Sequence, residues 1–281
     1  MLFYYFVSNS FFFQILFYYS FFFSIQSNVH YDTSNNLGAA YRRMKSEGKN
    51  ELVLGEGEWR VEEGDLDGYG RFVLDKSTKI IGQGRGLTTL VGVGLWIQGN
   101  KSDGIVEIHD LTIKGGEEGG LYASWGMKVI TRGCTIEECE EDGVWAYEAD
   151  ITCDDLQVIG CGRSGVCAWR TATITLSGQS TSIQGNVTRG YSYYYGLHTW
   201  TSSSSIHLVH PLTKKQISKK NGGGGNWGGR GTIEQIGGGS PGETKSDVTT
   251  PSVSLFLFFS FEILGRLVLL LVLLMVDGSG L

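Results

Sequence analysis

Aromatic side chains recur at two fixed positions in the middle of the chain, where a ligand could contact them. The residues at these two positions, in chain order, are Tyr122, Trp145, Cys167 and His198, then Ser124, Tyr147, Trp169 and Trp200. Flat rings spaced along extended strands suit the apolar faces of sugar rings. The pattern predicts a carbohydrate-binding face made of Tyr122, Trp145, Tyr147, Trp169, His198 and Trp200. The alternative is a ladder of rings that stack only with one another and stiffen a sheet.

Carboxylates form a second cluster that could do chemistry. Residues 107–155 contain 13 Asp and Glu against 3 Lys and Arg, which argues against nucleic acid as a partner. Two pairs of glutamates stand 23 residues apart. Like charges that stack in a repeating structure repel unless water solvates them or a cation bridges them. A solvated acidic corner and a calcium site both remain open, and the candidate calcium ligands are Glu117, Glu118, Glu140 and Glu141.

The cysteines give no sign of a metal or redox centre. All five lie within 34 residues, at Cys134, Cys139, Cys153, Cys161 and Cys167. Without a Cys-x-x-Cys pair, the sequence indicates neither a zinc ribbon nor a thioredoxin-type site, and we expect buried thiols. Cys139 and Cys161 are expected to be stacked neighbours, free inside a cell and disulfide-bonded if the chain is secreted. The glycine run at 222–225 lacks the ending of a phosphate loop, so no nucleotide cofactor is predicted.

The aromatic positions belong to a repeat that predicts the fold. A glycine followed by an aliphatic residue occurs at Gly120, Gly143, Gly165 and Gly196, at intervals of 23, 22 and 31 residues. A second motif keeps the same spacing upstream, at Leu111–Ile113, Cys134–Ile136 and Leu156–Val158. Short strands with glycine corners are typical of a right-handed parallel β-helix, whose coils stack ~4.8 Å apart. We therefore predict an all-β solenoid of about 22–23-residue coils over residues 51–236.

The repeat also predicts which side chains point inward. One interior ladder is expected to contain Leu121, Val144, Val166 and Leu197, and another Ile113, Ile136 and Val158. The residues between them then point outward, which places the aromatic positions on one face. The 31-residue interval contains nine residues more than the 22-residue one, and these must leave the coil. We expect the tyrosine-rich loop Tyr191–Tyr195 to overhang the aromatic face.

Segments near the start of the solenoid resemble a known family. Glu51–Trp59 is an apolar run followed by glycine and an aromatic residue, and Lys79–Gly84 and Thr88–Gly92 match the next strand pair. In these features about two thirds of the chain resembles the pectin-lyase-like superfamily of right-handed parallel β-helices. The resemblance implies a polysaccharide as the substrate class. It does not imply a reaction, since the superfamily includes lyases, hydrolases, epimerases and non-catalytic binding modules.

Catalytic motifs of the superfamily are mostly missing. A polygalacturonase-like hydrolase would carry Asn-Thr-Asp, Gly-His-Gly and Arg-Ile-Lys besides paired aspartates, and only Asp154-Asp155 is present. Arg132 is a poor candidate for a lyase base, because neighbouring carboxylates would keep it charged. No catalytic residue is therefore predicted. The sequence favours a non-catalytic carbohydrate-binding or interaction module, and the alternative is a polysaccharide lyase or glycoside hydrolase with an unrecognised site.

The two ends differ in composition from the solenoid. Residues 1–27 are apolar and aromatic, and residues 255–276 are apolar except for Glu262 and Arg266; a polar linker, 237–254, precedes the second segment. The first segment is a candidate signal or membrane anchor and the second a candidate membrane anchor, which would make the protein membrane-associated or secreted. Mis-assigned coding sequence is the alternative at both ends. No pattern predicts an oligomeric state.

Overall fold

The computed structural model describes residues 29–74 and 77–237. The predicted terminal segments, 1–27 and 255–276, and all but the first residue of the predicted linker lie outside the described residues. No helix within the described ranges is long and apolar enough to cross a membrane.

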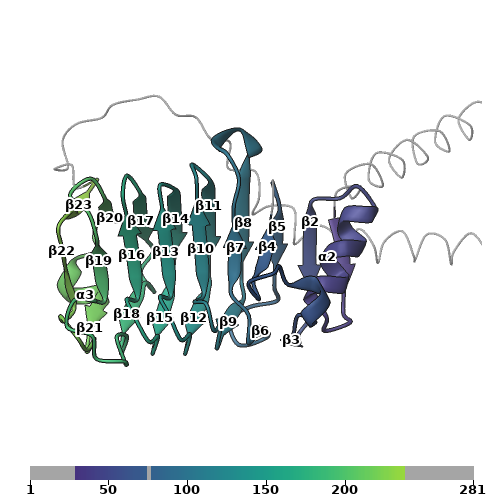
Figure 1. Ribbon diagram of the computed structural model, residues 1–281, viewed down its shortest axis with the longest axis horizontal. Coiled ribbons are helices and arrows are strands. Elements are labelled where there is room, and N and C mark those ends of the chain that lie inside the picture. The colour runs from purple at the N-terminus through teal and green to yellow at the C-terminus, as the bar shows by residue number, and fades with distance from the viewer. Residues whose placement is uncertain (1–28, 75–76, 238–281) are drawn as a thin grey trace, which may run out of the picture. The chain divides into compact units, whose positions relative to one another are not determined.

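The described chain is a parallel β-solenoid made of three sheets, and successive strands of each sheet come from successive coils (Figure 1). The first sheet has nine strands: β1 Val29–Asp32, β2 Glu51–Leu54, β5 Lys79–Ile81, β8 Ile105–His109, β11 Lys128–Arg132, β14 Asp150–Asp154, β17 Thr173–Ser177, β20 Ser205–Val209 and β23 Thr232–Ile236. The second sheet has seven: β3 Gly57–Trp59, β6 Thr88–Val91, β9 Thr112–Lys114, β12 Thr135–Glu137, β15 Gln157–Ile159, β18 Ser182–Gln184 and β21 Ser218–Lys219. The third also has seven: β4 Phe72–Leu74, β7 Leu95–Ile97, β10 Leu121–Ser124, β13 Val144–Tyr147, β16 Val166–Trp169, β19 Leu197–Thr199 and β22 Trp227–Gly229.

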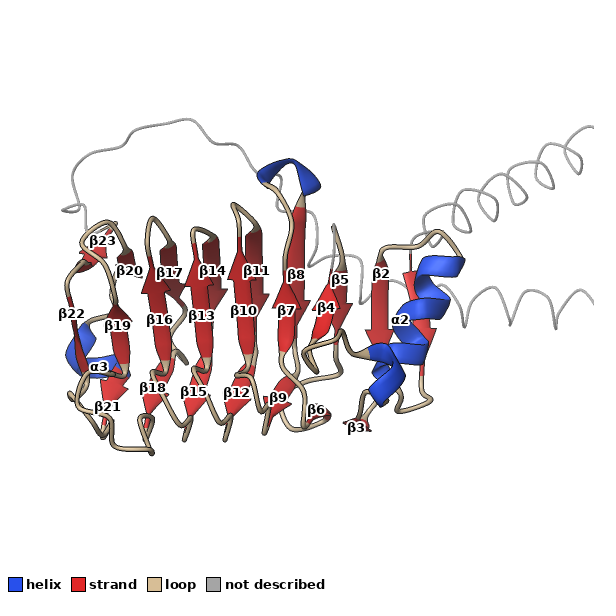
Figure 2. Ribbon diagram, viewed as in Figure 1, coloured by secondary structure: helices blue, strands red, loops and turns tan. Residues whose placement is uncertain are grey.

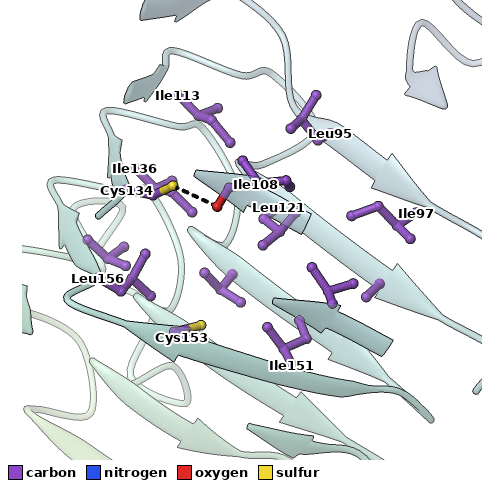
Figure 3. Packing of buried hydrophobic residues seen from close by; sticks show 14 of the residues in the cluster. Leu95, Ile97, Ile108, Ile113, Leu121, Cys134, Ile136, Ile151, Cys153 and Leu156 are labelled. Carbon is purple, nitrogen blue, oxygen red and sulfur yellow. Dashed lines mark hydrogen bonds between the residues drawn. The ribbon is translucent and has the colours of Figure 1, made fainter. Parts of the chain in front are cut away.

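The strand register confirms the predicted interior ladders. In the third sheet Leu121, Val144, Val166 and Leu197 are successive partners. In the second sheet Ile113, Ile136 and Val158 are successive partners. All seven side chains are buried in one core, and Figure 3 shows Leu121, Ile113 and Ile136 converging on the interior. Stacking is what buries them, because one coil alone cannot cover its apolar face.

The glycine before each aliphatic residue is required by a close approach. A Cβ on Gly143 would lie 2.3 Å from Cγ1 of Val158, and a Cβ on Gly120 would lie 2.3 Å from Cγ2 of Ile136. At these glycines, just before each strand of the third sheet, the backbone is in contact with the interior ladder of the second sheet, Ile136 and Val158. Any larger residue would push the two apart.

A helix precedes the predicted start of the solenoid at Glu51. Helix α2, Leu37–Ser46, lies beside β2 (Figure 2), and strand β1 pairs in parallel with β2. The side chain of Asn36 caps the helix by accepting a hydrogen bond from the backbone N–H of Ala39 at 2.9 Å. Leu37, Ala40 and Met44 are buried in the core. Three short helices complete the described elements: η1 Glu63–Asp65, η2 Lys101–Asp103 and α3 Lys214–Ile217.

All five cysteines are buried free thiols, as expected in the absence of a Cys-x-x-Cys pair. Cys139 and Cys161 occupy equivalent places in successive coils, since Glu137 and Ile159, two residues before each, are register partners, in agreement with the predicted stacking. The Cys134 thiol donates to the carbonyl oxygen of Ile108 at 3.3 Å (Figure 3). Burial raises the pKa of Cys134 to about 11 and that of Cys153 to about 12, so these thiols stay protonated.

Candidate functional site

The outward positions of the third sheet hold a file of aromatic rings, Trp96, Tyr122 and Trp145, which ends where Cys167 follows in register and Trp145 stacks on Trp169 of the next position instead. Ring centroids of Trp96 and Tyr122 are 4.0 Å apart, those of Tyr122 and Trp145 are 4.9 Å apart, and the stacked pair Trp145 and Trp169 is 5.7 Å apart. Trp96 is the cross-strand partner of Tyr122 and was not predicted. Its segment, Gly94-Leu95-Trp96, nevertheless carries the repeated glycine–aliphatic–aromatic pattern.

A second file of rings lies at the carboxyl ends of these strands, where Tyr147 and Trp169 are the last strand residues and Trp125 and Trp200 come directly after a strand. Centroid distances are 5.2 Å from Trp125 to Tyr147, 5.4 Å from Tyr147 to Trp169 and 5.8 Å from Trp169 to Trp200. Trp125 is 55 % exposed, and the other three are partly exposed. Because the parallel strands of successive coils end next to one another, each coil contributes one ring to this file.

The tyrosine-rich loop lies over this face, as the 31-residue interval predicts. The ring of Tyr193 lies 6.3 Å from that of Trp200, and the ring of Tyr194 lies 5.7 Å from it. Tyr193 is 54 % exposed, whereas Tyr194 is buried. We call the rings of Trp125, Tyr147, Trp169, Tyr193 and Trp200 the aromatic surface.

His198 lies under this loop, although it occupies an outward position. The rings of Tyr194 and Tyr195 lie 5.9 Å and 5.3 Å from its imidazole, which is only 3 % exposed. Burial lowers the pKa of His198 to about 4, so the ring is neutral at physiological pH. Its Nδ1 lies 3.1 Å from Oγ of Ser164.

A groove opens beside the loop. It has a volume of about 410 Å³ and is lined by Tyr193, Tyr195, His198, Trp200, Gly229 and Arg230. The Arg230 side chain is exposed and supplies a positive charge. The groove therefore combines three large rings with one cation, in the size range of ligand pockets.

A smaller cavity of about 150 Å³ lies next to the groove. It is lined by Asp142, Trp145, Arg163, Cys167, Trp169, Tyr194 and Trp200. Oδ1 of Asp142 accepts a hydrogen bond from the backbone N–H of Ser164 at 2.9 Å. Burial raises the pKa of the Asp142 carboxyl to about 7. The six predicted carbohydrate-binding residues thus lie on one sheet, and Trp145, Trp169, His198 and Trp200 line one or both hollows.

Arginines bind the predicted acidic corner. Arg189 donates to Oε2 of Glu140 at 2.7 Å and to Oε1 of Glu141 at 3.0 Å, and Arg163 forms a second ion pair with Glu141. Glu117 and Glu118, the other candidate calcium ligands, are exposed. The described residues contain no group of three or more side chains placed to hold a metal ion. Arg163 and Arg189 therefore offset the negative charge of Glu140 and Glu141. The spacing of the glutamates alone did not predict these arginine partners.

Comparisons with known proteins identify the architecture. A family model described as "Right handed beta helix region" matches residues 65–210. No curated protein matches the chain. Among solved structures, the chain is similar to the A-module of the mannuronan C-5 epimerase AlgE4 from Azotobacter vinelandii, with 14 % identity, 72 % of this chain and 93 % of that chain covered, and a TM-score of 0.21. A likeness of this strength carries no argument about activity.

Proposed function

The chain belongs to the family of right-handed β-helix proteins, and we propose that it is a non-catalytic member that binds carbohydrate through its aromatic surface. The groove of about 410 Å³ carries the proposal. Tyr193, Tyr195 and Trp200 offer flat apolar walls there, and a sugar ring presents flat apolar C–H faces to such walls. Arg230 adds a hydrogen-bond donor at the edge, which would orient hydroxyl groups.

The spacing of the rings supports a chain-like ligand. Outside the groove, Trp125, Tyr147 and Trp169 come from three successive coils. An extended glycan lying along the third sheet would meet one ring in each coil. Ring-to-ring contacts hold these side chains in place, so that binding orders few additional groups. The stacking ladder and the binding face are therefore compatible descriptions of the same rings.

The positions and hydrogen bonds of the paired aspartates, Asp154 and Asp155, argue against a catalytic role. Asp154 and Asp155 belong to the first sheet and the turn after it, not to the sheet that carries the aromatic surface. Oδ1 of Asp154 accepts a hydrogen bond from Ser177 at 2.8 Å, and Oδ1 of Asp155 accepts one from the backbone N–H of Ser180 at 2.7 Å. Both carboxylates thus have local structural partners.

A Tyr193→Ala variant tests the binding proposal. Tyr193 lines the groove and is largely exposed, so its removal leaves no core cavity. We expect an affinity loss of about 1 kcal/mol, or roughly fivefold, for the polysaccharide that binds best among neutral glucans, mannans and xylans and acidic uronans. The melting temperature should change by less than about 3 °C. Tyrosine-to-alanine substitution at Tyr31, 66 % exposed on the first sheet, is the matched control and should bind as the wild type does. Equal affinity of the Tyr193 and Tyr31 variants would overturn the proposal.

A polysaccharide lyase or glycoside hydrolase is the second candidate, and one observation favours it. The raised pKa of Asp142, about 7, allows this carboxyl to hold a proton near neutral pH, as general acids do. Hydrolysis by the usual route needs a second carboxyl across the scissile bond. The neighbouring Glu140 and Glu141 are both bound by arginines. Non-catalytic binding therefore accounts for more of the site.

A further inference from the structure

We propose that the cavity beside Trp145 binds the terminal, uncharged sugar residue of a glycan whose following residues lie in the groove. This inference rests on the proposed function and adds that the protein recognises chain ends. Trp200 lines both hollows, so a ligand that passes this ring occupies the two in succession. The cavity, at about 150 Å³, is well below the size of the groove, at about 410 Å³.

Size alone sets a limit on what enters the cavity. Its volume equals that of about five water molecules in the liquid, room for one hydroxylated six-membered ring. A ligand pocket for a larger molecule usually exceeds ~300 Å³. The cavity can therefore take one residue of a glycan chain, and we place the terminal residue there.

Two buried donors in the cavity walls lack acceptors. Nε1–H of Trp145 and Nε–H of Arg163 are both inaccessible to solvent, and neither has a hydrogen-bond partner among the described residues. Buried donors are almost always paired, because an unpaired one loses its hydration without replacement. Both side chains line the cavity, where the ring oxygen and hydroxyl oxygens of a sugar would accept these bonds.

Asp142 supplies the complementary acceptor. The residue is 7 % exposed, and its carboxyl accepts a hydrogen bond from the backbone N–H of Ser164. The two carboxyl oxygens keep lone pairs beyond this bond in either protonation state, which leaves capacity for hydroxyl groups of the ligand. Donors and an acceptor in one small cavity match a polyhydroxylated ring, which is donor and acceptor at once.

Charge in the cavity favours an uncharged sugar residue. The guanidinium of Arg163 is already paired with Glu141 and lies over the ring of Tyr194, 5.5 Å from its centroid. A carboxylate on the ligand would meet the carboxyl of Asp142 without an unpaired cation to balance it. The aromatic walls, by contrast, suit the apolar face of any pyranose.

A conservative substitution separates this role from packing. Trp145→Phe keeps an aromatic ring in the file but removes the unpaired Nε1–H donor. Because that donor has no partner among the described residues, the variant should melt at or above the wild-type temperature. We expect its affinity for the best-binding neutral polysaccharide among soluble β-glucan, mannan and xylan to fall at least threefold. Tyr31→Phe, which changes an exposed ring on the first sheet away from the aromatic surface, is the control and should bind as the wild type does.

A second measurement uses only the wild-type protein. Partial acid hydrolysis of the same polysaccharide increases the number of chain ends at constant mass. Binding per unit mass should increase in proportion to the ends. Undiminished affinity of Trp145→Phe, or binding that follows mass and not ends, would overturn the terminal-residue inference while leaving the aromatic surface intact. Failure of all polysaccharides to bind would instead overturn the proposed function, and this inference with it.

Discussion

Burial acts in opposite directions on two neighbouring side chains, Asp142 and His198. The pKa of Asp142 is raised to about 7 and that of His198 is lowered to about 4, in each case because burial disfavours the charged form. Ser164 connects them, since its backbone N–H donates to Asp142 and its Oγ lies 3.1 Å from Nδ1 of His198. Both groups are therefore largely uncharged in the folded protein at mildly acidic pH.

The two shifts have opposite consequences for stability. Between pH ~4 and 7 the folded state holds a proton on Asp142 that the unfolded state has lost, so this residue's contribution to stability falls as pH rises through that window. Between pH ~6.5 and 4 His198 binds a proton in the unfolded state but not in the folded state. The contribution of His198 to stability therefore falls as pH decreases. In the wild type the two effects offset each other over most of this range.

An Asp142→Asn variant should expose the difference. The amide does not titrate, so at pH 8 the variant avoids the cost of burying a charged carboxylate. At pH 5 it lacks the stabilisation that the wild type gains from the proton bound to Asp142. Its free energy of unfolding relative to the wild type should fall by roughly 3 kcal/mol from pH 8 to pH 5, at about 1.4 kcal/mol per proton and pH unit below the folded pKa of about 7. His198 is present in both proteins, so its contribution cancels. Urea titrations at pH 5, 6.5 and 8 measure the difference, and parallel pH profiles for the two proteins would show that Asp142 titrates normally.

At the residue scale, ring types and spacing were enough to predict the aromatic face, but not how deeply each residue is buried. His198 follows the repeat to an outward position and is then covered by Tyr194 and Tyr195. The path of that loop depends on contacts with residues far along the chain, such as the approach of Gly224 to the Tyr195 ring. Local periodicity carries no information about such contacts.

At the element scale, the stacking of β10, β13 and β16 determines which side of each strand faces the core. Val144 on β13 is completely buried between its partners Leu121 and Val166. A shift of one residue in this register would exchange all inward and outward side chains. The identity of the aromatic surface thus depends on the same pairing as the core.

Val144→Asp tests the register. An unpaired carboxylate between two aliphatic neighbours should cost several kcal/mol and lower the melting temperature by roughly 10 °C or more. Val53 on β2 points outward and is half-buried, so Val53→Asp is the matched control and should cost much less. Thermal denaturation monitored by circular dichroism compares the two variants. Similar melting temperatures would contradict the inward placement of Val144.

Repeat spacing explains which elements were predictable. Coils from β10 to β16 keep intervals of 22 or 23 residues, so their glycines mark the strands directly. Gly94-Leu95-Trp96 has the same pattern but lies 26 residues before Gly120, because η2 lengthens that coil. Helix α2 was missed because it is outside the repeat altogether. Its own signals, an Asn36 cap and apolar residues at helical spacing, are local.

At the scale of the whole described solenoid, the proposed binding surface lies along one sheet of three. Because the coils stack in register, equivalent residues of successive repeats lie in rows. In the third sheet the aromatic rings lie on the outward side. The long insertion between β18 and β19 then adds the wall that converts a flat face into a groove. The fold could be predicted because every coil repeats it. The overhang of the tyrosine-rich loop followed from the 31-residue interval, but the groove itself could not be predicted, because Gly229 and Arg230 from a later part of the chain also line it.

Titration calorimetry of the protein against the panel of neutral and acidic polysaccharides, followed by chromatographic sizing of the recovered polysaccharide, tests the central claim most directly. Non-catalytic binding predicts a saturable heat of binding for at least one polysaccharide, together with an unchanged chain-length distribution after prolonged incubation. Recovery of shortened chains would contradict that claim in favour of a lyase or hydrolase. The absence of binding to every polysaccharide would contradict the carbohydrate account itself.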